Sequence, residues 1–309
     1  MNVLLSCVNA MRAFELAFGT PRKLPKPNQL SGRVAVVDIA FAGTAGGGFE
    51  KVTKKFLDGL GDRLAAWIDH HDHERHADYA GDPRFVLSTK AEHGACPEMI
   101  TPQIVERAGP IDTIVCHNDF DGLASAAKWM RGGDEPYPGC DADAHAIDTR
   151  TGQPSEMAAL CDRALRARPR DRQLFCTLVY ALADGLKNST QLSLISEAAA
   201  EMIPIEKETA RAAAAYRRYS RRGGGGVAYV DVADGFRRLD KTGLLLLGQE
   251  LEQISIVADQ QNVTLAAPFE SGVNFLKLLG LDGGMPTRVS VSRSRLDEVL
   301  ERLEVELIP

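Results

Sequence analysis

Apolar runs that each end in an acidic or imidazole side chain recur through the first half of this 309-residue chain. They are residues 33–40, 64–68, 113–116 and 144–147, with Asp38, Asp69, His117 and Asp148 at or just after their ends. Helical stretches separate the runs, and strands that alternate with helices are typical of a parallel α/β sheet. Ligands bind such sheets beyond the carboxyl ends of the strands. The pattern therefore predicts an α/β fold with a polar site along one edge of a parallel sheet.

The chain is long enough for two domains, and four consecutive glycines mark a boundary between them. We expect residues 1–194 to form a parallel-sheet catalytic domain, residues 195–226 a connecting helix and Gly-rich linker, and residues 227–309 a second, smaller α/β substrate-binding domain. All seven histidines and all six cysteines lie before residue 177. This asymmetry indicates chemistry in the first domain and substrate handling in the second.

Several further elements are expected from the apolar pattern. In the first domain these are helices over 49–60 and 171–188. In the second they are strands over 227–232, 254–258 and 288–291, helices over 239–251, 273–279 and 296–307, and a turn at residues 283–284.

The composition argues against several classes of protein. A net charge of −6 disfavours a protein that binds long duplex nucleic acid. No apolar run reaches the ~18 residues that a membrane span needs, and no basic residue precedes the apolar N-terminal stretch, as it would in a secretory signal. The cysteines form no CxxC pair, which disfavours a metal-thiolate site. We expect a cytoplasmic protein that does not contact membranes.

Residues 117–121 carry three candidate metal ligands, which are His117, Asp119 and Asp121. In an extended segment their alternation would direct all three to one side, and Gly122 would allow a tight turn into the next helix. This spacing suits one ion held by His117 and Asp119, with Asp121 reaching a second ion. The alternative is a polar strand-to-helix turn in which one acid caps the helix.

A second cluster is Asp69-His70-His71. Adjacent histidines cannot share one direction, so one can bind metal while the other faces a substrate phosphate. Asp69 can fix the tautomer of a histidine from outside the coordination sphere. His73 and His76 continue the cluster, and we expect them on a solvated face.

Two more acids are candidate ligands. Asp38 ends a hydrophobic run, where an unpaired carboxylate is costly, and it could bridge two ions or cap the following turn. Asp184 on a mostly apolar helix could be a ligand or could pair with Lys187. Asp148 and His145 are weaker candidates that could instead stabilise their loop.

The set of carboxylates and imidazoles suits Mn²⁺, Zn²⁺ or Fe²⁺. Two clusters imply two ions, which together clamp the attacking and leaving oxygens of a phosphoryl displacement.

In the second domain, Gly283 and Gly284 precede Met285 and Arg288. Glycines allow close approach of the backbone to a ligand, and arginine suits bidentate phosphate recognition. The alternative is a Gly-Gly turn with a surface arginine.

These motifs resemble those of the DHH phosphoesterase superfamily. The triplet at 69–71 matches its signature, and HNDFDGLASA at 117–126 is similar to its HxDxDGxxSA motif. The second domain is similar to the DHH-associated C-terminal domain, which carries a Gly-Gly-His substrate loop. The resemblance covers the chain from about residue 33 onward.

The resemblance implies a role for each residue. His117 and Asp119 would hold one Mn²⁺, Asp121 and His70 a second, with Asp38 as the bridge, Asp184 as the last acidic ligand and His71 on the scissile phosphate. Two departures stand out. The DHH motif here precedes the DxD motif, as if the domain were circularly permuted, and Met285 replaces the histidine of the substrate loop. Either Arg288 takes over phosphate binding or the substrate differs.

Together these features predict a Mn²⁺-dependent phosphohydrolase, similar to nanoRNases, that cleaves a small phosphodiester or short oligonucleotide. One alternative is a phosphoanhydride hydrolase acting on pyrophosphate or short polyphosphate. Another is a non-catalytic, nucleotide-binding regulatory protein. The oligomeric state is left open, and a homodimer is one of the candidates.

Overall fold

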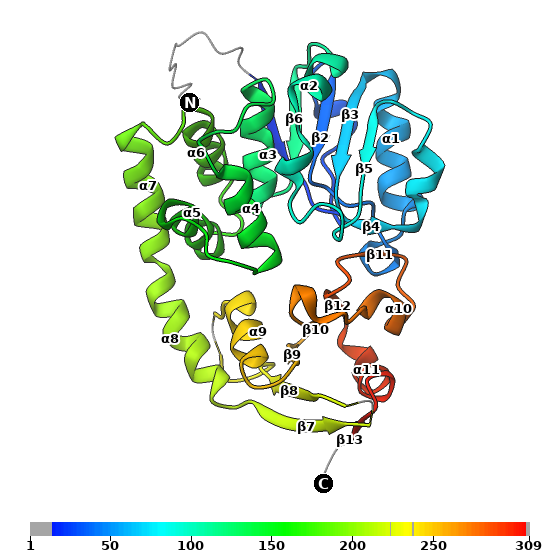
Figure 1. The fold of residues 1–309 in the computed structure, drawn as a ribbon, viewed down its shortest axis with the longest axis vertical. Helices are drawn as coiled ribbons and strands as arrows, with labels where there is room; N and C mark the ends of the chain where they lie inside the picture. The colour runs from blue at the N-terminus through cyan, green and yellow to red at the C-terminus, as the bar shows by residue number, and fades with distance from the viewer. Residues whose placement is uncertain (1–13, 223, 237, 307–309) are drawn as a thin grey trace.

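The computed structural model describes residues 14–222, 224–236 and 238–306. They form two α/β domains that follow one another along the long axis of the molecule (Figure 1). The first domain is built on a five-stranded sheet in which every pairing is parallel, with the strand order β1-β6-β2-β3-β5. Its strands are β1 Glu15–Phe18, β2 Val34–Val37, β3 Leu64–Asp69, β5 Phe85–Leu87 and β6 Thr113–Cys116. This arrangement confirms the predicted parallel α/β sheet.

Helices cover both faces of this sheet (Figure 1). They are α1 Lys55–Leu60, which continues a π-helical segment Glu50–Lys54, then α2 Pro102–Ala108, α3 Phe120–Met130, α4 Cys140–Thr149, α5 Glu156–Ala167 and α6 Arg172–Ala183. Alternate residues of β2 point to opposite faces of the sheet. Val34 and Val36 pack with α1, whereas Ala35 and Val37 pack with α3 and its neighbours. A strand covered on both sides is apolar throughout, which is why the central runs were readable from the sequence.

Residues 144–147, predicted as a strand, instead lie within α4. A short apolar run does not distinguish a buried strand from a buried helix. Here Asp141 and Asp143 occupy the first helical turn, and the buried Ala144 and Ile147 have the i, i+3 spacing of a helix face. Asp148 therefore lies in the last turn of a helix and not at the end of a strand.

The second domain contains a six-stranded mixed sheet with the order β12-β10-β9-β8-β7-β13. Its elements are β7 Arg217–Arg221, β8 Gly226–Asp231, α9 Lys241–Gln249, β9 Ile254–Ala258, β10 Asn262–Ala266, α10 Phe275–Leu279, β12 Arg288–Ser292, α11 Leu296–Arg302 and β13 Val305–Glu306. Only β8 and β9 pair in parallel. One face packs on α10 and α11, and the other on α9. The observed sheet confirms a second α/β domain.

The stretch expected to be a single connecting helix is divided into three elements. Helices α7 Ser189–Ala200 and α8 Met202–Ala213 run down one side of the molecule (Figure 1). The arginine-rich segment that follows is not helical, because its backbone pairs with β8 on one side and β13 on the other as β7. The sequence analysis assigned this segment to the connecting helix. The long-range pairing with strands later in the chain determined a strand instead.

A short pairing joins the two domains beside the DHH motif. The strand β4, Asp72–His73, pairs antiparallel with β11, Gly283–Gly284, so the expected Gly-Gly turn is part of a two-stranded ladder. A Cβ added to Gly283 would lie 2.2 Å from Cδ2 of His73, which excludes any other residue without movement. The second-domain loop is therefore held directly against the segment that comes after the DHH motif.

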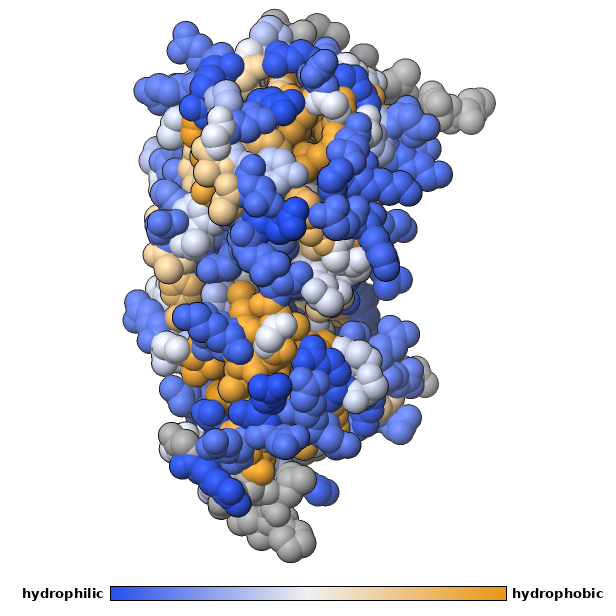
Figure 2. Space-filling model, turned by 90° about the vertical axis from the view of Figure 1, so that its right-hand side faces the viewer, coloured by the Kyte–Doolittle hydropathy of each residue, from blue (hydrophilic) through white to orange (hydrophobic). Residues whose placement is uncertain are grey.

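No helix in the described part of the chain is long and apolar enough to cross a membrane. The expectation about a secretory signal concerns residues 1–13, which lie outside the described residues. Figure 2 shows one side of the molecule, where hydrophilic residues surround smaller hydrophobic patches, a mixture that is normal for a protein surface.

Candidate metal centre

Asp38 lies directly after β2, at the carboxyl edge of the parallel sheet. Its backbone N–H donates to the carbonyl of Ile68 over 2.9 Å, and its φ of 57° places it in the left-handed region. A non-glycine residue there is strained, and such strain is often found at functional sites. The side chain is 1% exposed, and neither carboxylate oxygen makes a well-aligned hydrogen bond with any described residue. Two buried oxygens without well-aligned donors could bind a cation.

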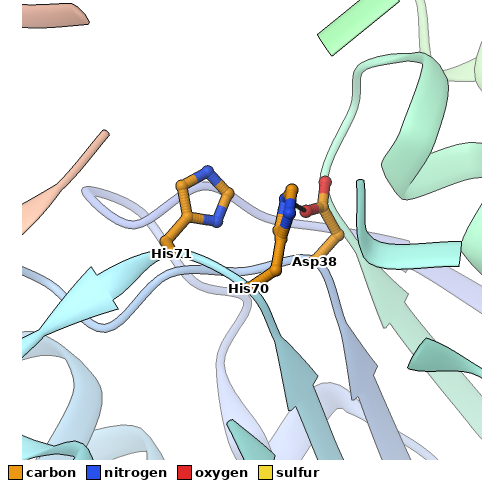
Figure 3. Close-up of side chains that lie close together, drawn as sticks. All are labelled: Asp38, His70 and His71. Atoms are coloured by element: carbon orange, nitrogen blue, oxygen red, sulfur yellow. Dashed lines mark ion pairs between the residues drawn. The ribbon is translucent and has the colours of Figure 1, made fainter. Parts of the chain in front are cut away.

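His70, directly after β3, faces this carboxylate (Figure 3). Its Nδ1 lies 2.9 Å from the carbonyl oxygen of His93, to which it can donate. Its Nε2 lies 3.2 Å from Oδ1 of Asp38 and 3.4 Å from Oδ2 of Asp121. A backbone carbonyl that holds one ring nitrogen leaves the other directed at the ligand position, which is the usual arrangement of a metal-binding histidine.

The ring of His71 lies beside that of His70, with the ring centroids 4.7 Å apart and the ring planes inclined at 77° (Figure 3). Its Nδ1 lies 2.9 Å from Oδ1 of Asp69, which is completely buried. Burial would raise the pKa of Asp69, but the charge and hydrogen bond of His71 lower it below its ordinary value. An ionised Asp69 thus fixes the tautomer of His71 and leaves Nε2 for another partner.

The third set of candidate ligands lies at the start of α3. Asp119 is the N-cap of this helix and Asp121 lies in its first turn, so the helix begins at Phe120, before the Gly122 start predicted from the sequence. His117 Nδ1 lies 2.6 Å from Oδ2 of Asp119 and 3.7 Å from Oδ2 of Asp38. The predicted extended segment is therefore wrong for Asp121, although its side chain still reaches His70.

Gly122 allows this close approach. A Cβ there would lie 2.7 Å from the carbonyl oxygen of His117 and 2.9 Å from Oδ2 of Asp38. Only a residue without a side chain lets the first turn of α3 pack against the strand ends at this distance.

Lys90 also lies in the cluster, although no sequence pattern pointed to it. It is 1% exposed, and its Nζ lies 3.0 Å from Nε2 of His70 and forms an ion pair with Asp148. Burial lowers the pKa of Lys90, while the charges of Asp121 and Asp38 oppose that shift. The polar stretch around Lys90 has no periodic pattern in the sequence, so only its contacts reveal it.

Asp148 belongs to the cluster, and Asp184 does not. Oδ2 of Asp148 lies 3.8 Å from Nε2 of His70. Asp184 is exposed at the C-terminal cap of α6 and takes part in no candidate ligand group of the described residues. The structure thus places Asp148 where the resemblance led us to expect Asp184. The signal for Asp148 was present in the sequence but was assigned to a strand end.

The other histidines have structural partners. His73, expected on a solvated face, is buried, with its ring 5.7 Å from that of Phe41. It lies there because β4 pairs with β11 and carries the side chain inward. His76 is partly buried and stacks on His73, and His145 lies 2.6 Å from Glu98.

The buried carboxylates and imidazoles of the cluster shift one another's pKa. Burial and the charge of Asp121 raise the pKa of Asp38 well above its ordinary value. Burial would also raise the pKa of Asp121, but His70 holds it well below its usual range. Burial would lower the pKa of His70, yet Asp121 and Asp38 raise it to about 10. Carboxylates that repel one another so closely favour bound cations.

Three groups of side chains bring ligand atoms within 4.8 Å of one another: Asp38 with His70 and His71, Asp38 with His117 and Asp119, and His70 with Asp121 and Asp148. Both carboxylate oxygens of Asp38 and the buried Oδ1 of Asp119 lack a hydrogen-bond partner among the described residues. These oxygens therefore fit the role of metal ligands. These buried Asp and His residues could hold a metal ion.

A cavity of about 620 Å³ opens beside the cluster, between the two domains. Asp148 and Arg150 line it from the first domain, and Phe269, Met285 and Arg288 from the second. Burial and the nearby Arg150 lower the pKa of Arg288 to about 10. Two guanidinium groups that repel one another in a shared cavity are suited to an anionic ligand. Gly283 and Gly284 do not line the cavity, since they pair with β4.

The sequence matches no known protein-family model and no curated protein. The likeness to DHH phosphoesterases therefore rests on the sequence features alone.

Proposed function

We propose that this protein is a Mn²⁺-dependent phosphohydrolase that cleaves a small phosphodiester or short oligonucleotide. The observation that carries the proposal is the convergence of Asp38, His70, His117, Asp119 and Asp121 at one sheet edge, beside an arginine-lined cavity. Oxygen and imidazole donors of this kind suit Mn²⁺. The resemblance implies two ions, and the ligand groups would place one on Asp38, His117 and Asp119 and the other on His70, Asp121 and Asp148.

Bound divalent ions would supply charge stabilisation and an activated water for attack on phosphorus. The chain's own residues would do the rest. Asp69 would orient His71 so that its Nε2 faces the scissile phosphate. Arg288 and Arg150 would hold further phosphate oxygens, because planar guanidinium groups bind them through paired hydrogen bonds.

The dimensions of the cavity favour a short substrate. A volume of about 620 Å³ lies within the usual range for a small-ligand pocket. Asp148 lines the cavity and also contacts His70, so a ligand held there would reach the cluster. Phe269 offers one face on which a base could stack, whereas Phe275, the other aromatic near the loop, is buried in the core.

The presence of two arginines and only this one aromatic side chain along the described lining supports the second candidate, a phosphoanhydride hydrolase acting on pyrophosphate or short polyphosphate. Such a substrate would need two phosphate-binding guanidinium groups and no base platform. The nucleotide-binding regulatory role is the third candidate, and it differs from both because it requires no turnover.

The test is hydrolysis of a 5′-labelled RNA dinucleotide in Mn²⁺ by wild type, Asp119→Ala and Asp184→Ala. The exposed Asp184 is the matched control, since it was a predicted ligand that the structure places outside the cluster. Wild type and Asp184→Ala should release mononucleotide. The rate of release by Asp119→Ala should be more than about 100-fold lower than that of wild type. Even loss of an outer partner of a metal ligand lowers affinity or activity by about 10–100-fold.

Failure of wild type to release mononucleotide would refute the short-oligonucleotide proposal. The same three proteins would then be given pyrophosphate and tripolyphosphate. Turnover there, abolished by Asp119→Ala, would establish the phosphoanhydride candidate. Absence of any turnover would leave the regulatory role.

A further inference from the structure

The Lys90 side chain is built into the cluster by the loop that carries it. The backbone N–H of Lys90 donates to Oδ2 of Asp72, in β4, over 3.2 Å. The carbonyl of Thr89 accepts from the N–H groups of both Glu92 and His93 at 3.0 Å, which closes the turn. Glu92 in turn accepts from the Thr89 hydroxyl at 3.0 Å. A lysine on a loop tied in this way has a fixed position, unlike a mobile surface lysine.

The Lys90 ammonium nitrogen lies at one of the candidate ion positions. It is 3.0 Å from Nε2 of His70, donates to the carbonyl of Gly94 over 3.2 Å, and pairs with Asp148. Nε2 is the nitrogen that His70 directs at the carboxylates, and Asp148 is in the same ligand group. Nζ also lies 3.4 Å from Nδ1 of His70, so it packs against the ring. A cation bound by His70, Asp121 and Asp148 would share this small volume with an ammonium group that repels it.

The other candidate ion position, at Asp38, His117 and Asp119, has different ion-pair partners. Among the described residues, only histidines form ion pairs with Asp38 and Asp119. The orphan oxygens of Asp38 and of Asp119 face this position. The cluster therefore contains one ligand group that already includes a lysine ammonium and one whose ion-pair partners are histidines alone.

We propose that Lys90 permanently fills the second cation position, so that the chain binds one divalent ion, on Asp38, His117 and Asp119, and not two. This inference rests on the proposed function, because it presumes that the cluster is a metal centre. A resident lysine supplies positive charge beside His70 without exchanging with solvent. The phosphate of a substrate would then meet one metal ion and one lysine where the resemblance implies two metal ions.

The test is a count of bound Mn²⁺ on the full chain. Protein stripped with chelator is reloaded with Mn²⁺, freed of excess ion and measured by native mass spectrometry and elemental analysis. Wild type should hold one ion per chain, and Lys90→Met, which keeps the length of the side chain but removes its charge and donors, should hold two. Lys207→Met, at an exposed lysine of α8, is the matched control and should hold one.

Electron paramagnetic resonance gives an independent readout. An isolated Mn²⁺ in wild type should show an uncoupled six-line signal, and a pair of ions in Lys90→Met should show exchange coupling. Lys90→Gln is a second variant for the case that the methionine disturbs folding, and circular dichroism verifies the fold of each protein.

Every outcome decides the inference. Two ions on wild type would overturn it while leaving the proposed function intact. No ion on wild type would overturn both. One ion on wild type and still one on folded Lys90→Met or Lys90→Gln would also overturn it, because lysine would then not be what excludes the second ion.

Discussion

Asp38→Asn should make the metal-free protein more stable while abolishing its response to Mn²⁺. The carboxylate is 1% exposed, its oxygens lack well-aligned donors, and Asp121 and Asp119 repel it. Asparagine removes the charge, tolerates the left-handed backbone at this position, and keeps an oxygen that can accept from the Nε2–H of His70. Most buried aspartates behave in the opposite way, because they are paired.

The size of the effect follows from the burial. An unsatisfied buried polar group costs about 1–3 kcal/mol, so the free energy of unfolding should rise by about that amount. For a domain of about 150–250 residues, such as the one that contains Asp38, 1 kcal/mol corresponds to a shift of about 2–4 °C in Tm, which gives a rise of roughly 2–12 °C. Wild type should gain about 2.7 kcal/mol from Mn²⁺ at a concentration of 100 Kd, and the variant should gain nothing.

The assay is calorimetric unfolding of wild type, Asp38→Asn and Asp184→Asn, each with chelator and with Mn²⁺. The exposed Asp184 controls for the loss of one negative charge, and its variant should follow wild type in both conditions. A lower Tm for metal-free Asp38→Asn than for metal-free wild type would refute the reasoning. It would mean that contacts within the protein already stabilise the Asp38 carboxylate without a bound cation.

Other predictions concern the substrate cavity, the domain contact and pH. Arg288→Gln should raise KM for a phosphorylated substrate by about 10–100-fold, the loss of one charged hydrogen-bonded contact, with unchanged Mn²⁺ binding by mass spectrometry; an unchanged KM would remove Arg288 from the site. Gly283→Ala should lower kcat/KM without loss of bound Mn²⁺, because the new Cβ would lie 2.2 Å from His73 and break the β4–β11 pairing; wild-type kinetics would show that this pairing does not position the loop. Burial would lower the pKa of His117, but Asp119 raises it to about 9. Below that pH the metal-free ring carries a proton that an ion must displace, so the apparent Mn²⁺ affinity should rise about tenfold per pH unit between about pH 6 and about pH 8. A calorimetric titration that gave constant affinity over this range would contradict the assignment of His117 as a ligand.

The sequence by itself determined the central strands and most of the candidate cluster. Strands β2, β3 and β6 are covered on both faces, so their apolar runs are uninterrupted. The polar residues that come after such runs must emerge at one edge, since parallel strands share a direction. Asp38, His70 and His117 could therefore be grouped before any contact was known, because each lies within two residues of a strand end.

Only the tertiary structure decided the remainder. Lys90 comes from a turn whose sequence carries no signal of the cluster, and Asp148 was expected at a strand end but comes from a helix. Their positions depend on packing against residues far along the chain. Arg217–Arg221 became a strand because β8 and β13 supply its partners. A local pattern fixes the direction of a strand and the identity of the residues at its carboxyl end. Which loops and helices close over that edge is set by long-range contacts, and those contacts placed a lysine among the metal ligands and left Asp184 in solvent.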